Sequence, residues 1–196
     1  MTEKKKLSTS YKLLRALGFH YSEEEYGQVS LWGIIKQAIG NTYRKHLQKM
    51  MDWSIIEPIA PRKLRAVILR RIGCNVGKNV YIGDFVRVDL HYASYITIDD
   101  EVQISAGCRL LCHKRNISTY QLDDNYPDLP FKKAPIHICK KVALGQETFV
   151  MPGVTIGEGS VIGARSLVTK DIPAHCVAVG SPAKVIRQIE KREGNA

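Results

Sequence analysis

The sequence has no apolar run long enough to span a membrane. Its uninterrupted apolar stretches are short, such as Val67–Leu69, whereas a transmembrane helix needs about 20 apolar residues. The chain starts with three lysines at positions 4–6, but Ser, Thr, Lys and Arg follow in place of the apolar region of a signal peptide. We therefore expect a soluble, cytoplasmic protein.

Closely spaced cysteine pairs are also missing. None of the five cysteines forms a Cys-x-x-Cys pair, and an odd, scattered set argues against both a disulfide framework and a zinc knuckle. We expect these cysteines to be reduced and mostly buried. They are Cys74, Cys108, Cys112, Cys139 and Cys176.

Acidic residues are few beside the basic ones, and the net charge is +10. Such a charge favours an anionic partner, which means a phosphorylated cofactor, nucleic acid or an acidic membrane surface. The basic residues are not interleaved with aromatic ones in a stacking pattern, which argues against nucleic acid. The length of 196 residues suits one main domain, with a small appended segment at most.

What the sequence does contain is a six-residue repeat from Ile138 onward. Every sixth residue is aliphatic, and the residue four places after each is small or β-branched. The aliphatic series is Ile138, Leu144, Val150, Ile156, Ile162 and Val168, and the second series is Val142, Thr148, Val154, Ser160, Ser166 and Ile172.

A period of six fits neither an α-helix nor one ordinary strand, but it suits very short strands separated by tight turns. Three such strands would close one triangular coil, so residues 18 apart would stack as the core of a solenoid. The predicted stacked pairs are Ile138 with Ile156, Leu144 with Ile162, and Val150 with Val168.

Weaker hexads precede this block, at Val76, Ile82 and Val88 and again at Ile98, Ile104 and Leu110. About four extra residues separate these two sets. Residues 114–135 must leave the coil as a long loop before Ile138. The fold class is therefore mainly β, with a three-sided parallel coil over residues 72–181.

Apolar residues recur at helical spacing over residues 7–19, 30–51 and 62–71, which predicts an N-terminal helical segment over residues 1–71. This basic, amphipathic segment either docks on a membrane surface or an acceptor or packs on the first coil. At the other end, residues 182–193 are predicted as a short C-terminal helix with Val185, Ile186 and Ile189 on its inner face, ahead of a tail to residue 196.

The stretch from Met151 to Pro173, MPGVTIGEGSVIGARSLVTKDIP, and the stretch from Val179 to Ile186, VGSPAKVI, resemble the hexapeptide-repeat acetyltransferases of the maltose, galactoside, nodulation and colanic-acid type. The resemblance covers residues 70–190 and leaves residues 1–60 unexplained. It implies a left-handed parallel β-helix and a homotrimer. It also implies acyl sites in clefts between adjacent subunits, with acetyl-CoA lying along the C-terminal coils and no metal.

Acetyl transfer from a thioester needs a base, because the attacking hydroxyl or amine must lose its proton, and histidine is suited to this role. The resemblance places the catalytic histidine at His113, where the last coil before the long loop ends. Asp89 or Asn116 would orient its imidazole. His91 is expected beneath His113 on the same side of the coil, as a substrate contact.

A glycine-containing turn offers backbone N–H groups that stabilise the negative oxygen of the tetrahedral intermediate. Gly145 is the candidate, and by resemblance its turn and the backbone of Ala164 hold the pantetheine amides. Gly163 is expected either to contribute to this cofactor contact or to be required only for its turn conformation. The chain departs from the family at Gln146 and Arg165, where a small residue and a glycine are common.

Basic residues are needed where the phosphates of CoA emerge. By resemblance, Thr169 and Lys170 contact the adenine end, and Lys184 and Arg187 contact phosphate. The long loop would line the acceptor side, with Tyr120, Asp123 and Tyr126 as candidate contacts, together with Asp124 and Lys132.

A sugar, polysaccharide-precursor or glycolipid hydroxyl is the expected acceptor, ahead of a sugar amine. Serine is disfavoured because the long N-terminal helical domain of serine acetyltransferases is missing. Two other classes stay open. One is a zinc carbonic anhydrase-like coil, in which His91, His113 and His137 would bind zinc between subunits. His137 and His175 are otherwise expected in turns. The other is a non-catalytic scaffold.

Overall fold

The computed structural model describes residues 7–19, 26–52 and 61–190. The chain divides into two compact units. One comprises Met1–Tyr43 and Lys114–Lys132, and the other comprises Arg44–His113 and Lys133–Ala196. The described residues include no helix that is long and apolar enough to cross a membrane.

The three N-terminal stretches with helical spacing do form helices. They are α1 (Thr9–Ala16), α3 (Leu31–Met50) and α4 (Pro61–Ile72). Ser8 caps α1, because its hydroxyl accepts a hydrogen bond from the N–H of Tyr11 at 3.1 Å.

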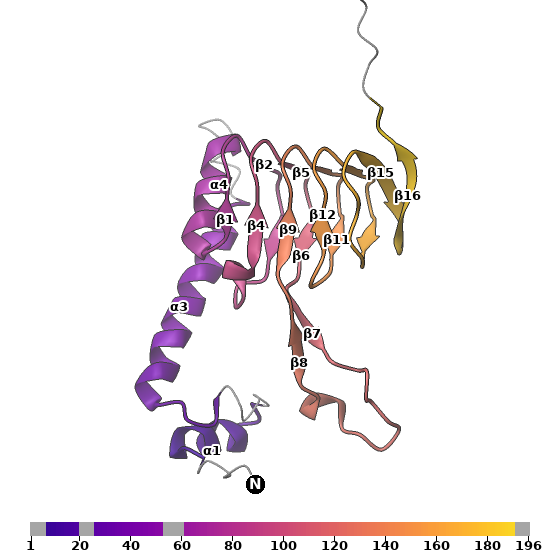
Figure 1. The fold of residues 1–196 in the computed structure, drawn as a ribbon. Helices are drawn as coiled ribbons and strands as arrows, with labels where there is room; N and C mark the ends of the chain where they lie inside the picture. The colour runs from indigo at the N-terminus through magenta and orange to yellow at the C-terminus, as the bar shows by residue number, and fades with distance from the viewer. Residues whose placement is uncertain (1–6, 20–25, 53–60, 191–196) are drawn as a thin grey trace, which may run out of the picture. The chain divides into compact units, whose positions relative to one another are not determined.

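The described strands of the second unit form three parallel sheets, which we call A, B and C (Figure 1). Sheet A contains β1 (Asn75–Val76), β4 (Ile96–Ile98), β9 (Ile136–Ile138) and β12 (Thr155–Ile156). Sheet B contains β2 (Tyr81–Ile82), β5 (Gln103–Ile104), β10 (Ala143–Leu144), β13 (Val161–Ile162), β15 (Cys176–Gly180) and the antiparallel β16 (Ala183–Gln188). Sheet C contains β3 (Arg87–Val88), β6 (Arg109–Leu110), β11 (Phe149–Val150) and β14 (Leu167–Val168).

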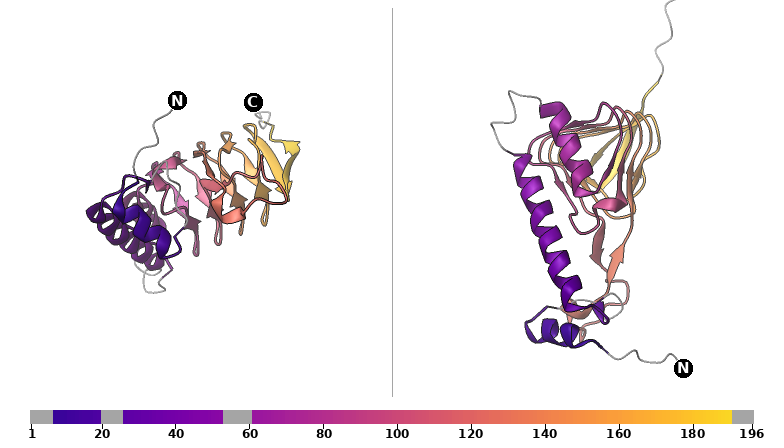
Figure 2. Two further views of the ribbon diagram at one scale, coloured as in Figure 1. Left: turned by 90° about the horizontal axis from the view of Figure 1, so that it is seen from below. Right: turned by 90° about the vertical axis from the view of Figure 1, so that its left-hand side faces the viewer.

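From β1 to β14, strands of the three sheets follow one another in the rotation A, B, C, apart from the pair β7 and β8. After β14, the isolated parallel bridge between Ile172 and Ile156 takes the place of a sheet A strand before β15. The left panel of Figure 2, seen from below, shows the resulting turns of chain stacked on one another. All three predicted stacked pairs are confirmed: Ile138 pairs with Ile156, Leu144 with Ile162, and Val150 with Val168.

The core of this unit consists of the aliphatic residues at the sixth positions, which are fully or almost fully buried. The second series is buried as well, including the polar members Thr148, Ser160 and Ser166. The Thr148 hydroxyl donates to the Gly145 carbonyl at 2.8 Å, and the Ser160 hydroxyl donates to the Pro173 carbonyl at 2.6 Å. These bonds satisfy polar groups that would otherwise be costly to bury.

The two interruptions of the repeat lie where the sequence predicts them. The extra residues after Val88 include a 3₁₀ helix, η2 (Ala93–Tyr95). The long loop leaves after β6 through β7 (His113–Arg115) and returns through β8 (Phe131–Lys133). These two strands pair with each other, and the 3₁₀ helix η3 (Tyr126–Asp128) lies between them.

The predicted C-terminal helix is wrong, because residues 183–188 form the strand β16. This strand pairs antiparallel with β15 after a tight turn in which Gly180 has a φ of 105°. The open edge of β15 offers unpaired backbone groups, and the β-branched pair Val185 and Ile186 favours a strand. Instead of packing inward, these two side chains are exposed.

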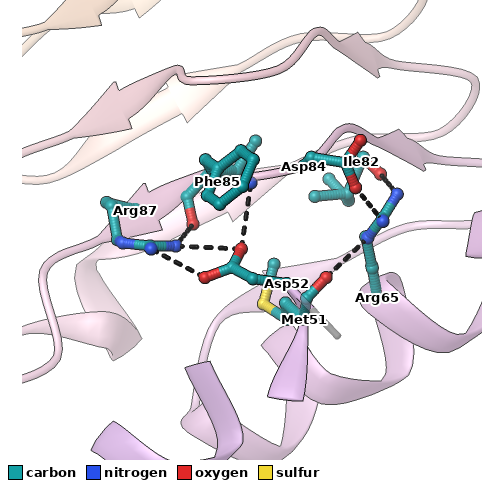
Figure 3. Close-up of polar contacts among 8 residues, drawn as sticks. Met51, Asp52, Arg65, Ile82, Asp84, Phe85 and Arg87 are labelled. Carbon is teal, nitrogen blue, oxygen red and sulfur yellow. Dashed lines mark hydrogen bonds and ion pairs between the residues drawn. The ribbon is translucent and has the colours of Figure 1, made fainter. Parts of the chain in front are cut away.

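Helix α4 packs against the first coil through β1 and β2. The fully buried Arg65 donates to the carbonyls of Met51 at 2.9 Å and Ile82 at 3.3 Å, and it also pairs with Asp84 (Figure 3). A burial of this kind is tolerated only when the guanidinium is fully hydrogen-bonded.

A second contact lies beside the first. Asp52 pairs with Arg87 at 2.7 Å and accepts the Phe85 N–H at 3.0 Å (Figure 3). The two contacts fasten the end of α3 and the helix α4 to the first coil.

Candidate functional site

His113 lies at the corner where the chain leaves sheet C toward sheet A, at the first residue of β7. Its side chain is 28% exposed. The imidazole is therefore held by its surroundings and still reaches solvent, as a residue that exchanges protons with a ligand must.

Asp89, one coil earlier on the same corner, holds this imidazole. Its side chain is 2% exposed, and its Oδ2 contacts the Nδ1 of His113. The same carboxylate accepts the backbone N–H groups of Cys112 at 3.2 Å and of His91 at 3.3 Å. Because an ionised carboxylate only accepts hydrogen bonds, Nδ1 of His113 carries the proton in this contact.

The charge state of Asp89 follows from these contacts. Burial raises the pKa of the Asp89 carboxyl, but the hydrogen bond and charge of His113 and the N–H groups of Cys112 and Tyr92 outweigh burial. The net result is a pKa below the ordinary value of 3.8. Asp89 is thus a carboxylate at neutral pH.

The ring that packs on His113 belongs to Tyr92, which sequence reasoning missed. The two ring centroids lie 5.3 Å apart and the rings are tilted. The Lys133 ammonium lies 5.0 Å from the centroid of the Tyr92 ring. One sequence feature could have predicted this contact: Tyr92 lies among the extra residues that interrupt the repeat after Val88, three positions after Asp89.

Two buried cysteines lie next to the Asp89 carboxylate. Burial, and secondarily the charge of Asp89, raise the pKa of Cys112 to about 12. Burial, followed by Cys112 and Asp89, raises the pKa of Cys74 to about 12 as well. Neither thiol is therefore a nucleophile at neutral pH. The expectation for the cysteines is confirmed, because all five are free and four are buried.

Asn116, the alternative partner of His113, and His91, the expected substrate contact beneath it, make other contacts. The side-chain oxygen of Asn116 accepts the Ser118 hydroxyl at 2.8 Å and the Ser118 N–H at 3.3 Å. Asp89 thus makes the orienting contact. His91 contributes its backbone N–H to Asp89, whereas its side chain is exposed.

The turn after β10 corrects the expectation for Gly145. Its N–H donates to the Ile162 carbonyl at 2.8 Å, so this group is not available to an oxyanion. Within the described residues, the backbone N–H groups of Gln146 and Ala164 have no acceptor. These two groups occupy equivalent positions of successive coils.

Gly145 is still required at this turn, for a steric reason. A Cβ there would lie 2.5 Å from the Ala164 nitrogen and 2.8 Å from the Gly163 carbonyl carbon. A Cβ on Gly163 would lie 2.6 Å from Cγ1 of Val179. Neither glycine has a positive φ, and Glu147 and Arg165 adopt it instead, at 58° and 57°. Close packing of coils, not turn conformation, therefore demands Gly163.

The predicted nucleotide contacts divide between two places. Thr169 and Lys170 follow β14 and are exposed on the same corner as His113, toward the C-terminal coils. Lys184 and Arg187 are exposed on β16, at the edge of sheet B.

Four groups of the candidate site lie along the two edges of sheet C. His113 and Lys170 lie on the edge toward sheet A, whereas Gln146 and Ala164 lie on the edge toward sheet B. The outward residues of sheet C lie between these edges, and they include Arg109 and Phe149.

The candidate acceptor contacts lie in the unit that contains Lys114–Lys132. Tyr120 and Tyr126 meet edge to face, with ring centroids 6.2 Å apart, and both are exposed. Asp123, Asp124 and Lys132 are exposed as well.

Within one chain, the described histidines His91, His113 and His137 do not form one group of metal-binding side chains. His137 lies in strand β9, not in a turn, and pairs with Asp99 at 3.0 Å. Among the described residues, the one group of three side chains of metal-binding type is Asp99, His137 and Cys139. His175 does lie in a turn, with a φ of 54°.

No known family model matches the chain. It is 37% identical over 172 residues to an Escherichia coli (strain K12) protein named "Putative colanic acid biosynthesis acetyltransferase WcaF", which covers 82% of this chain and 87% of that protein. It is 54% identical over 74 residues to the Staphylococcus aureus (strain COL) protein named "Putative acetyltransferase SACOL2570". That match spans only 37% of each protein.

Two solved structures resemble this chain. A maltose O-acetyltransferase from Clostridium difficile 630 matches with a TM-score of 0.61 and 27% identity, over 79% of this chain and 88% of that one. A galactoside acetyltransferase in complex with coenzyme A matches with a TM-score of 0.56 and 26% identity, over 80% of this chain and 84% of that one.

Proposed function

Because the chain belongs to the hexapeptide-repeat acetyltransferase family, we propose that it transfers an acetyl group from acetyl-CoA to a hydroxyl of a sugar or polysaccharide precursor. The observation that carries this proposal is the pairing of His113 with the buried Asp89 carboxylate on a corner of the coil. We also infer that the three parallel sheets are the sides of a left-handed β-helix, in line with the resemblance of the repeat.

In the proposed reaction, Nε2 of His113 takes the proton of the acceptor hydroxyl as its oxygen attacks the thioester carbonyl. Asp89 holds the proton on Nδ1 and stabilises the imidazolium that forms. When the tetrahedral intermediate collapses, the carbon–sulfur bond breaks and the imidazolium gives its proton to the departing CoA thiolate. The ester and free CoA are the products, and His113 returns to its starting state.

The N–H of Gln146 is the proposed donor to the oxyanion, and the N–H of Ala164 is the proposed contact to pantetheine. Both groups are supported by having no acceptor within the described chain. Because a backbone N–H is the donor, a glutamine side chain at position 146 does not remove it.

The placement of these groups supports a site shared between subunits. His113 and Gln146 lie at opposite edges of sheet C, so we propose that one copy supplies the imidazole and the next copy supplies the turn. In a closed ring of copies, this arrangement turns sheet C toward the symmetry axis. A homotrimer is the ring that the family resemblance implies.

The residues proposed to bind the nucleotide end of CoA lie toward the C-terminal coils. We propose that Lys170 and Thr169 contact the nucleotide of CoA, with Lys184 and Arg187 close to its phosphates, because charge-assisted bonds to phosphate are strong. The exposure of these four side chains and the net charge of +10 support this assignment.

A carbohydrate acceptor is supported by the names of the relatives, which concern colanic acid, maltose and galactoside. The exposed Tyr120 and Tyr126 of the long loop are the proposed ring contacts.

A thiol-release assay with acetyl-CoA tests the proposal against a panel of sugars, sugar nucleotides and amino sugars. We expect acceptor-dependent release of CoA, with acetyl ester in the product. Ester formation distinguishes a hydroxyl acceptor from an amine, since hydroxylamine cleaves esters and leaves amides intact. A protein that binds no acetyl-CoA would instead be a scaffold, and the proposal would be wrong.

A further inference from the structure

The unit that comprises Met1–Tyr43 and Lys114–Lys132 buries very little apolar surface. Its buried large apolar side chains, among the described residues, are Tyr11 and Leu129. More than half of the large apolar side chains exposed in the described chain belong to this unit. Soluble proteins rarely leave so much apolar surface in one region unless something covers it.

The exposed side chains of α3 form one continuous stripe, which we call the apolar stripe: Trp32, Ile35, Ile39 and Tyr43. Successive members are three or four residues apart, which places them on one face of a helix. Their exposed fractions are 72%, 41%, 65% and 52%. The opposite face, at Ile34, Asn41 and Gln48, is half-buried, so the stripe lies on the more exposed face of the helix.

The charge around the stripe is positive. Helix α3 contains Lys36, Arg44, Lys45 and Lys49 and no acidic residue, and α1 contains Lys12 and Arg15 and no acidic residue. Lys36 lies one position after Ile35 and flanks the stripe. The described acidic residues of this unit lie in the loop, at Asp123, Asp124 and Asp128.

A bare apolar face flanked by lysine and bounded by a tryptophan and a tyrosine is the chemistry of a helix that lies in the plane of a lipid surface. We propose that the apolar stripe docks on an anionic lipid bilayer. Ile35 and Ile39 enter the boundary between headgroups and acyl chains, Trp32 and Tyr43 lie at headgroup level, and the basic residues of α3 meet lipid phosphates.

A second copy of the chain is the competing occupant, and charge disfavours a twofold pairing of stripes. In such a pairing each stripe would face its own equivalent, so two helices that carry only basic charges would approach each other. The lipid surface has the opposite charge. In the closed ring proposed above, the copies meet through sheet C, which contains no residue of the stripe. This inference is independent of acetyl transfer, because no residue of the stripe belongs to the proposed acetyltransferase site.

Vesicle flotation of the full-length protein tests the inference. We expect binding to vesicles of phosphatidylglycerol and phosphatidylcholine, and much weaker binding to phosphatidylcholine alone. The double variant Ile35→Gln/Ile39→Gln should lower partitioning at least about tenfold, and Lys36→Glu should lower it about fivefold. Ile186→Gln is the matched control, since Ile186 is 63% exposed, and it should bind as the wild type does.

Fluorescence provides a second readout. The chain contains two tryptophans, Trp32 and Trp53, so in a Trp53→Phe background the emission reports on Trp32 alone. A blue shift on adding anionic vesicles is expected. Absence of binding to anionic vesicles would overturn the inference. So would light scattering in which the double variant changes oligomeric mass, because the stripe would then cover a second copy.

Discussion

The Nδ1 atom of His113 donates a hydrogen bond to Oδ2 of Asp89, although the two residues lie 24 positions apart and in different coils. Stacking of short strands produces this contact, since the backbone N–H of Asp89 donates to Leu110 of the next coil at 3.0 Å.

His113→Ala should lower the turnover number at least about a hundredfold, which is the size expected for a general base. The affinity for acetyl-CoA should change little, because the imidazole acts on the acceptor proton. Thiol-release kinetics and calorimetric titration with CoA separate the two effects. Wild-type turnover by the purified variant would contradict the mechanism.

Asp89→Asn keeps the shape of the side chain and removes its charge. The imidazolium loses its carboxylate partner, so we expect kcat to fall at least about tenfold and the acidic limb of the kcat/KM profile to move to lower pH. If Asp89 had a purely structural role, its substitution would lower the amount of folded enzyme and leave the position of the acidic limb unchanged. The matched control is Asp100→Asn, a change to a carboxylate that serves a backbone turn instead, through the Lys78 N–H at 2.6 Å.

The lowered pKa of Asp89 also predicts a pH dependence of stability. A carboxyl with a folded pKa below its unfolded value of about 3.9 stabilises the protein above that pH and loses this contribution as the pH falls through the folded pKa. The wild type should therefore exceed Asp89→Asn in stability at pH 7 by more than at pH 3. Urea unfolding at both values checks this, and a constant difference would contradict it.

Lys170→Ala should raise the apparent KM for acetyl-CoA by roughly tenfold with little change in kcat, as expected for loss of one charge-assisted bond to phosphate. Lys141→Ala is a suitable control, because Lys141 is also exposed but lies on the other corner of sheet A. Equal effects of the two variants would point to general electrostatic attraction.

Gly145→Ala should destabilise the protein by about 1–3 kcal/mol, because the added Cβ would press on the backbone of Ala164 and Gly163. Gly40→Ala is the matched control. No atom lies within 4 Å of a Cβ built on Gly40, and alanine in a helix interior should stabilise by about 0.5–1 kcal/mol. Thermal unfolding measures both, and the prediction fails if Gly145→Ala unfolds at the wild-type temperature.

The sequence by itself determined the stacking of short parallel strands. A six-residue period of aliphatic residues leaves only one face per short strand to bury, so the stacked pairs, the extra residues after Val88 and the exit of the long loop could all be predicted from spacing. The position of His113 at a coil end also followed from the repeat, because a corner is the place where the regular register stops.

Tertiary structure decided what spacing does not encode. Whether residues 183–188 form a helix or a strand depended on the open edge of β15. Which group orients His113 depended on the stacking of the turn at Asp89 on the turn at His113. Tyr92 reaches the His113 ring because it lies among the extra residues that interrupt the repeat. Which N–H of the Gly145 turn remains unpaired depended on the next coil. All of these are contacts between residues far apart in the chain, and local pattern carries no information about them.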